Sequence, residues 1–107
     1  MTGAGEHFGT IRSRLRAARH NLAAAALSGD LRGQRTAAGA VLAAIRAAQG
    51  FTRSPSARTR DEWALWRVFA LAVLRHGTPP PGLLARARHL VEVGAINPNE
   101  IGDTHYH

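Results

Sequence analysis

The sequence predicts an all-α protein, a small antiparallel helical bundle of four main helices with a short C-terminal helical turn. Alanine, leucine and arginine are abundant and β-branched residues are sparse, a composition that favours helix over strand. Apolar residues recur at alternating spacings of three and four, which is the period of an amphipathic helix. Because 107 residues is an ordinary size for one domain, we expect a single helical domain over residues 1–107.

Residues 1–49 are predicted to form a basic helical hairpin. The first helix should run from about Phe8 to Leu27, because one apolar stripe follows it through Phe8, Ile11, Leu15, Ala18, Leu22 and Ala25. Gly29 suits the left-handed conformation that ends a helix, and Asp30 can cap the next one. The second helix should run from Leu31 to Gln49, and the short connection implies that the two helices are antiparallel.

Residues 50–60 are expected to be a linker, because the Ser54-Pro55 step disfavours regular structure. Thr59 is the predicted N-cap of the third helix, with Glu62 completing a capping box. That helix should run from Asp61 to His76. Apolar residues cover nearly its whole circumference, which predicts a position at the centre of the fold or across an oligomer interface.

The fourth helix should follow a proline-rich turn and run from about Gly82 to Val93, so that residues 61–95 form a second, apolar hairpin. Residues 96–107 are expected to hold a short turn and a tail. The turn is predicted at Asn97-Pro98-Asn99-Glu100, which combines an Asn cap, a proline at the first helical position and a glutamate two residues later.

The charge distribution is the main functional clue. All fourteen basic side chains are arginine; residues 1–60 hold ten of them against two acids, a balance of +8, and residues 61–107 hold four against five acids, a balance of −1. The absence of lysine is typical of a GC-rich bacterium, and codon bias would explain it. Codon bias explains less well why the arginines gather in one half of the chain.

A basic surface on the first hairpin and the linker is the predicted contact for nucleic acid. Arg12, Arg16 and Arg19 fall within about 60° of one another around the first helix. Because the planar guanidinium group bonds two phosphate oxygens at once, we predict that the protein binds the DNA or RNA backbone with little sequence specificity. The predicted contact residues are Arg12, Arg16, Arg19, Arg32, Arg35, Arg53, Arg58 and Arg60. The same arginines could also form ordinary solvated helix faces.

A second hypothesis is a protein–protein assembly or adaptor module, either self-associating or docking on an acidic partner. Small residues on the second helix would let another helix approach closely; these are Gly33, Ala37, Ala40 and Ala44. Trp63 is the predicted interface residue, because tryptophan is enriched at protein interfaces. A third hypothesis is binding of the basic first helix to an anionic membrane surface, but its apolar face is mostly alanine and is needed for the core.

Several classes of function are not expected. The chain has no cysteine, and therefore no disulfide, thiolate zinc site or thiol nucleophile. It shows neither a signal peptide nor an apolar stretch long enough to span a bilayer, so a soluble, cytoplasmic protein is expected. Without a phosphate loop or nucleophile elbow, we predict no enzyme activity, no catalytic residue and no cofactor. His105 and His107 flank Tyr106, but two histidines bind a metal weakly, so no metal site is expected.

Overall fold

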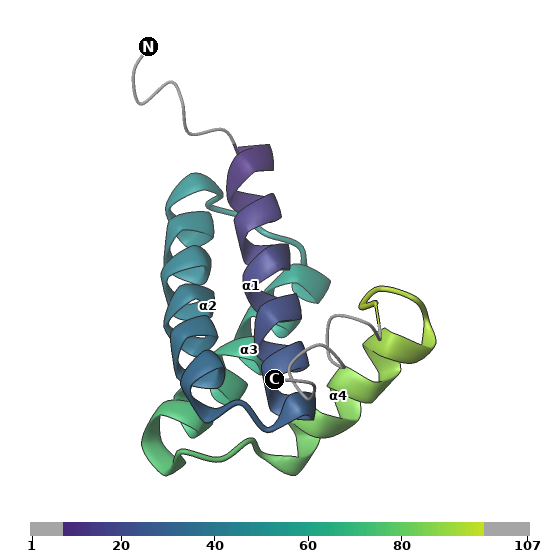
Figure 1. Ribbon diagram of the computed structural model, residues 1–107. Coiled ribbons are helices and arrows are strands. Elements are labelled where there is room, and N and C mark those ends of the chain that lie inside the picture. The colour runs from purple at the N-terminus through teal and green to yellow at the C-terminus, as the bar shows by residue number, and fades with distance from the viewer. Residues whose placement is uncertain (1–7, 98–107) are drawn as a thin grey trace.

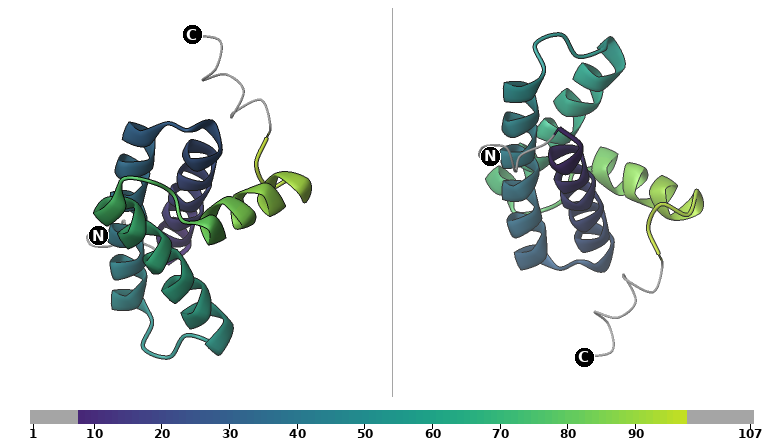
Figure 2. Two further views of the ribbon diagram at one scale, coloured as in Figure 1. Left: turned by 90° about the horizontal axis from the view of Figure 1, so that it is seen from below. Right: turned by 90° about the horizontal axis from the view of Figure 1, so that it is seen from above.

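The computed structural model describes residues 8–97 and is all-α, as predicted. Its helices are α1 (Phe8–Ser28), α2 (Leu31–Phe51), α3 (Ala57–His76) and α4 (Pro81–Glu92), and the described residues contain no strand. Figure 1 shows α1 and α2 side by side and antiparallel, with α3 crossing behind them. In both views of Figure 2, α4 projects from the side of α1 that faces away from α2. The fold is therefore a small helical bundle built on an α1–α2 hairpin.

The turn between α1 and α2 lies where its capping signals indicate. Gly29 has a φ of 74°, in the left-handed region, and the amide of Asp30 donates to the carbonyl oxygen of Ala25 at 3.0 Å. The carboxylate of Asp30 then accepts a hydrogen bond from the amide of Gly33 at 2.9 Å, which caps α2. Gln34 is buried in the first turns of α2, and its Nε2 donates to the carbonyl oxygen of Ala25 at 3.4 Å. Local capping therefore determines the position of this turn.

Alanine dominates the core of the described residues, where it makes up ten of the 21 buried hydrophobic residues. Ala23 of α1 and Ala38 of α2 have no exposed surface, so their side chains are fully enclosed by neighbouring residues. Because their side chains end at Cβ, the backbones of neighbouring helices can approach closely. Of the four small residues predicted as a close-approach strip on the second helix, Ala37 and Ala44 are buried and Ala40 is exposed.

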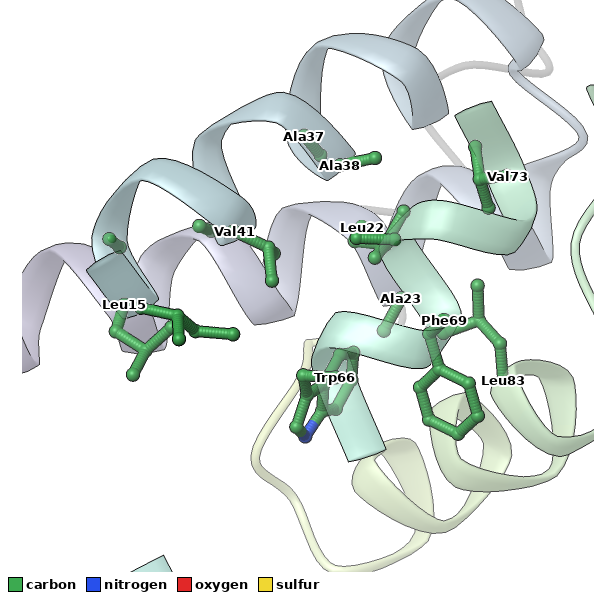
Figure 3. Close-up of a cluster of buried hydrophobic side chains, with 14 of the residues drawn as sticks. Leu15, Leu22, Ala23, Ala37, Ala38, Val41, Trp66, Phe69, Val73 and Leu83 are labelled. Atoms are coloured by element: carbon green, nitrogen blue, oxygen red, sulfur yellow. The ribbon is translucent and has the colours of Figure 1, made fainter. Parts of the chain in front are cut away.

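The buried aromatic side chains of the described residues all come from α3. The rings of Trp66 and Phe69 meet edge to face, with centroids 5.3 Å apart and an interplanar angle of 87°. Figure 3 shows Phe69 beside Leu83 of α4. A Cβ at Gly82 would lie 3.2 Å from the Phe69 ring, so the glycine allows α4 to begin against this ring. This aromatic cluster joins α3 to α4.

The connection between α2 and α3 is shorter than the predicted linker over residues 50–60. The N-cap of α3 is Ser56, whose hydroxyl accepts from the amide of Thr59 at 3.1 Å. The prediction that Thr59 caps this helix was therefore wrong. Both residues carry a capping hydroxyl, but a cap at Ser56 adds nearly one more turn of backbone hydrogen bonds to the helix. As a result, Arg58 and Arg60 lie on a helix and not on a flexible linker.

α3 buries only one face, so it does not occupy the centre of the fold, which was one of the two positions predicted for the third helix. The other position, an oligomer interface, stays a prediction. The buried residues of α3 share one side: Trp63, Trp66, Phe69, Ala70 and Val73. On the remaining surface, Val68 is 61% exposed and Leu74 is 40% exposed. Three bulky aromatic side chains on a single face supply the contacts of the helix with the core, so the other apolar residues are left outside. The predicted C-terminal turn lies outside the described residues, apart from Asn97.

We expect the alanine-rich core to tolerate no larger side chain at Ala38. Ala38→Leu adds a branched alkyl group where no surface is exposed and should lower the free energy of unfolding by about 1–3 kcal/mol. Ala43→Leu is the matched control, because it makes the same change at an exposed position of the same helix. Leucine and alanine have similar helix propensities, so the control should stay near the wild type in urea denaturation. Equal losses in the two variants would contradict this account.

Candidate nucleic-acid interface

The eight arginines predicted to contact nucleic acid do not form one surface. Because α1 and α2 are antiparallel, the N-terminal half of α1 lies beside the C-terminal half of α2. Arg32 and Arg35 start α2 and therefore lie at the opposite end of the hairpin from Arg12. The Nη2 atom of Arg35 lies 3.3 Å from the position that a Cβ would take at Gly77, which places it near the α3–α4 turn. Arg53 is exposed in the connection between α2 and α3.

Four of the predicted arginines do converge, on a cleft of ≈ 380 Å³ between α1, α2 and α3. We call it the arginine cleft; it is lined by Arg12, Leu15, Arg16, Arg19, Ala48, Arg58, Thr59, Glu62 and Trp63. Leu15, Ala48 and Trp63 are buried and form its apolar floor. Four arginines against the single carboxylate of Glu62 leave a formal charge of +3 on its lining (4 − 1). The cleft is therefore a concave site with a strongly positive rim.

Glu62 connects this cleft to α4. Its Oε2 lies 3.6 Å from Nη1 of Arg19, and its Oε1 lies 3.4 Å from Nη1 of Arg86. The pKa of the Arg19 guanidinium is lowered, first by burial and then by the charges of Arg16 and Arg86, while Glu62 opposes this shift. Arginine nevertheless stays protonated at neutral pH. One carboxylate thus brings together cations from two helices, α1 and α4.

A second group of arginines lies along the surface between α2 and α3. Two smaller hollows of ≈ 230 and ≈ 130 Å³ share Ile45, Gln49 and Arg67, so they form one continuous groove. We call it the arginine groove, after the three arginines that line it: Arg46, Arg60 and Arg67. Trp63 lines both the groove and the arginine cleft. The two basic regions therefore lie on either side of the first turns of α3.

We refer to the cleft and the groove together as the arginine belt, which contains Arg12, Arg16, Arg19, Arg58, Arg60, Arg67 and Arg46. The predicted residues Arg12, Arg16, Arg19, Arg58 and Arg60 belong to it, whereas Arg32, Arg35 and Arg53 do not line it. Arg67 was missed, although its spacing of seven residues from Arg60, two helical turns, places the two on one face. No local signal pairs Glu62 with Arg86, because they lie on different helices.

Trp63, predicted as an interface residue, is 7% exposed and belongs to the core. A side chain that is almost fully enclosed offers little area to a partner. The reason is its position: Trp63 begins the one face of α3 that turns inward, and its indole fills the space between the cleft and the groove. The buried side chain of Trp63 therefore contributes to the lining of both basic regions.

Comparisons with protein-family models, with curated proteins and with solved structures each found no match. No helix among the described residues is both long and apolar enough to cross a membrane. Within residues 8–97, no three histidine, aspartate or glutamate side chains are grouped closely enough to hold a metal ion. His105 and His107 lie outside the described residues.

The high positive charge predicts that the Tm of the protein depends on salt concentration. With a net charge of +7, repulsion between arginines should oppose folding, so screening should raise Tm. We expect Tm to rise by a few degrees from about 50 to about 500 mM sodium chloride, as the Debye length falls from roughly 14 to roughly 4 Å. Chloride is used because a multivalent anion could bind the cleft. A fall in Tm, measured by circular dichroism, would show that ion pairs such as Glu62–Arg19 outweigh the repulsion.

Proposed function

We propose that this protein binds the phosphate backbone of DNA or RNA with little sequence specificity, without catalysing a reaction, as an accessory factor or subunit of a larger complex. The observation that carries the proposal is the arginine belt, in which seven arginines from three helices surround the first turns of α3. Each arginine that neutralises a phosphate releases condensed counterions, and this release drives non-specific binding. The belt supplies several such contacts together.

The local charge balance supports this function. Asp61 and Glu62 are the acids of α3 beside the belt, so seven arginines and two carboxylates give a formal balance of +5 (7 − 2). The first turn of α3 contains no acid, and the positive end of its helix dipole adds to the attraction for anions. A phosphate backbone is an extended row of negative charges, which suits a basic surface that passes from the cleft to the groove.

The side chains present favour backbone contact over base recognition. Reading a base edge calls for paired hydrogen-bonding groups such as asparagine or glutamine, and Gln49 is the one amide side chain that lines the belt. Stacking on single-stranded bases calls for exposed aromatic rings, whereas Trp63, Trp66 and Phe69 are buried and the exposed Phe51 does not line the belt. We therefore expect duplexes of different sequence to bind with similar affinity.

Fluorescence anisotropy with a labelled generic duplex, single-stranded DNA and RNA over about 50 to 200 mM salt tests this function. Arg67→Gln should weaken binding to all sequences alike and reduce the slope of log affinity against log salt by about one. Arg16→Glu should also weaken binding to every sequence. Arg88→Gln is the matched control, because Arg88 is exposed on α4 and does not line the belt. The absence of binding at the lowest salt, or equal effects of Arg67→Gln and Arg88→Gln, would contradict the proposal.

The second candidate, a protein–protein assembly or adaptor module, is favoured by the outer face of α3. Val68 is 61% exposed there, and Leu65 and Leu71 are half-buried beside it. Self-association through this face should be insensitive to salt, because apolar burial drives it. Sedimentation should then show a dimer that Val68→Gln dissociates. A monomer mass that does not change with protein concentration would argue against the self-associating version.

A further inference from the structure

We propose that the arginine cleft is a discrete site for one phosphate dianion, as carried by the end of a nucleic-acid strand or by free phosphate, and that Glu62 competes with this ligand. The inference deepens the proposed function and rests on it in taking phosphate as the ligand of the belt. It adds that the two halves of the belt differ, because the cleft can also take a terminal phosphate, whereas the groove takes only internal backbone phosphates.

The linings of the two regions support this division. The cleft gathers four arginines around one space of ≈ 380 Å³, a usual volume for a small-molecule site, whereas each hollow of the groove is lined by two arginines. An internal phosphodiester is flanked by chain on both sides, so arginines can approach it only from its open side. A terminal phosphate projects from its chain and can enter the cleft.

The charge of the cleft matches a dianion better than a monoanion. Its lining carries +3 once Glu62 is counted, and a phosphate monoester carries about −1.5 to −2 at pH 7 against −1 for an internal diester. Arg16 and Arg58 approach from different helices, and neither side chain makes an ion pair or hydrogen bond within the described part of the chain. Both guanidinium groups are therefore available to bind a phosphate bidentately.

The first turn of α3 adds neutral donors to this site. Arg58 and Thr59 are its second and third residues, close to the positive end of the helix dipole. The Thr59 hydroxyl accepts a hydrogen bond from Ser56 Oγ at 2.9 Å, so its own proton is left to donate to a ligand. Phosphate oxygens can accept this hydrogen bond and can also pair two at a time with an arginine, which a chloride ion cannot do because it is a single atom.

The carboxylate of Glu62 is the one negatively charged group among the residues that line the cleft. Its contacts with Arg19 and Arg86, at 3.6 and 3.4 Å, are longer than the 2.7–2.9 Å of a strong charge-assisted hydrogen bond. A phosphate that makes short contacts with Arg19 would compensate the burial of that guanidinium better than Glu62 does. The carboxylate also repels an incoming dianion. Removal of its charge should therefore tighten phosphate binding, whereas removal of an arginine should weaken it.

The first arm of the test compares one duplex carrying either a 5′-phosphate or a 5′-hydroxyl group, by anisotropy at fixed salt. We expect the 5′-phosphate to bind about tenfold tighter. Arg16→Gln should abolish this preference and Glu62→Gln should increase it. Arg67→Gln, in the groove, should weaken both duplexes equally and leave their ratio unchanged. Circular dichroism checks that each variant is folded.

The second arm titrates inorganic phosphate alone by calorimetry, with sodium chloride of equal ionic strength as the control. Saturable phosphate binding that Arg16→Gln removes would support the cleft. If the first arm shows no 5′-phosphate preference, the same result would identify free phosphate, and not a strand end, as the ligand of the cleft. The same binding by a protein that binds no duplex would support the cleft but overturn the proposed function. Duplex binding with neither a 5′-phosphate preference nor saturable phosphate binding would overturn the cleft and leave the proposed function intact. Weaker phosphate binding by Glu62→Gln would overturn the role of Glu62.

Discussion

Close contact through alanine at the core of the α1–α2 hairpin is the constraint on which the rest of the structure depends. Residues such as Ala23 and Ala38 bury little area each, so they allow close approach but fill little volume. The hairpin supplies some larger side chains itself, such as Leu22 and Val41. α3 and α4 supply others, with Trp66 and Phe69 edge to face and Leu83 beside them (Figure 3).

This division of the core also positions the charge. The arginines of α1 lie beside its apolar stripe and not opposite it, so Arg12, Arg16 and Arg19 border the place where α3 docks. The N-terminal turns of α3 line the same cleft, which brings Arg58 to the rim. A basic cleft therefore forms as a consequence of the way the core is built. Glu62 lies within that rim and pairs with Arg19 and Arg86 at the same time.

The charge of Glu62 affects both the stability of the fold and the binding of anions, but in opposite senses. Its ion pairs involve side chains that are 25–36% exposed, and pairs of this kind contribute only about 0–1 kcal/mol. The charge of Glu62 has a larger effect on the electrostatic potential of the cleft, because this one carboxylate cancels one of the four arginine charges on the lining. In our proposal the residue therefore matters more for which anion enters the cleft than for whether the protein folds.

The sequence alone was sufficient to determine the all-α class, the approximate helix ranges and the shared face of Arg12, Arg16 and Arg19, because apolar periodicity and capping act within a few residues. It identified Asp30 correctly as a cap, but it could not choose between Ser56 and Thr59, since both carry the required hydroxyl. Only the tertiary structure decided that Arg58 joins the cleft, that Arg32 and Arg35 lie elsewhere, that Arg46 and Arg67 share a groove, and that Trp63 is buried. These outcomes depend on which helix faces meet, and that is decided by the fit between side chains far apart in the sequence.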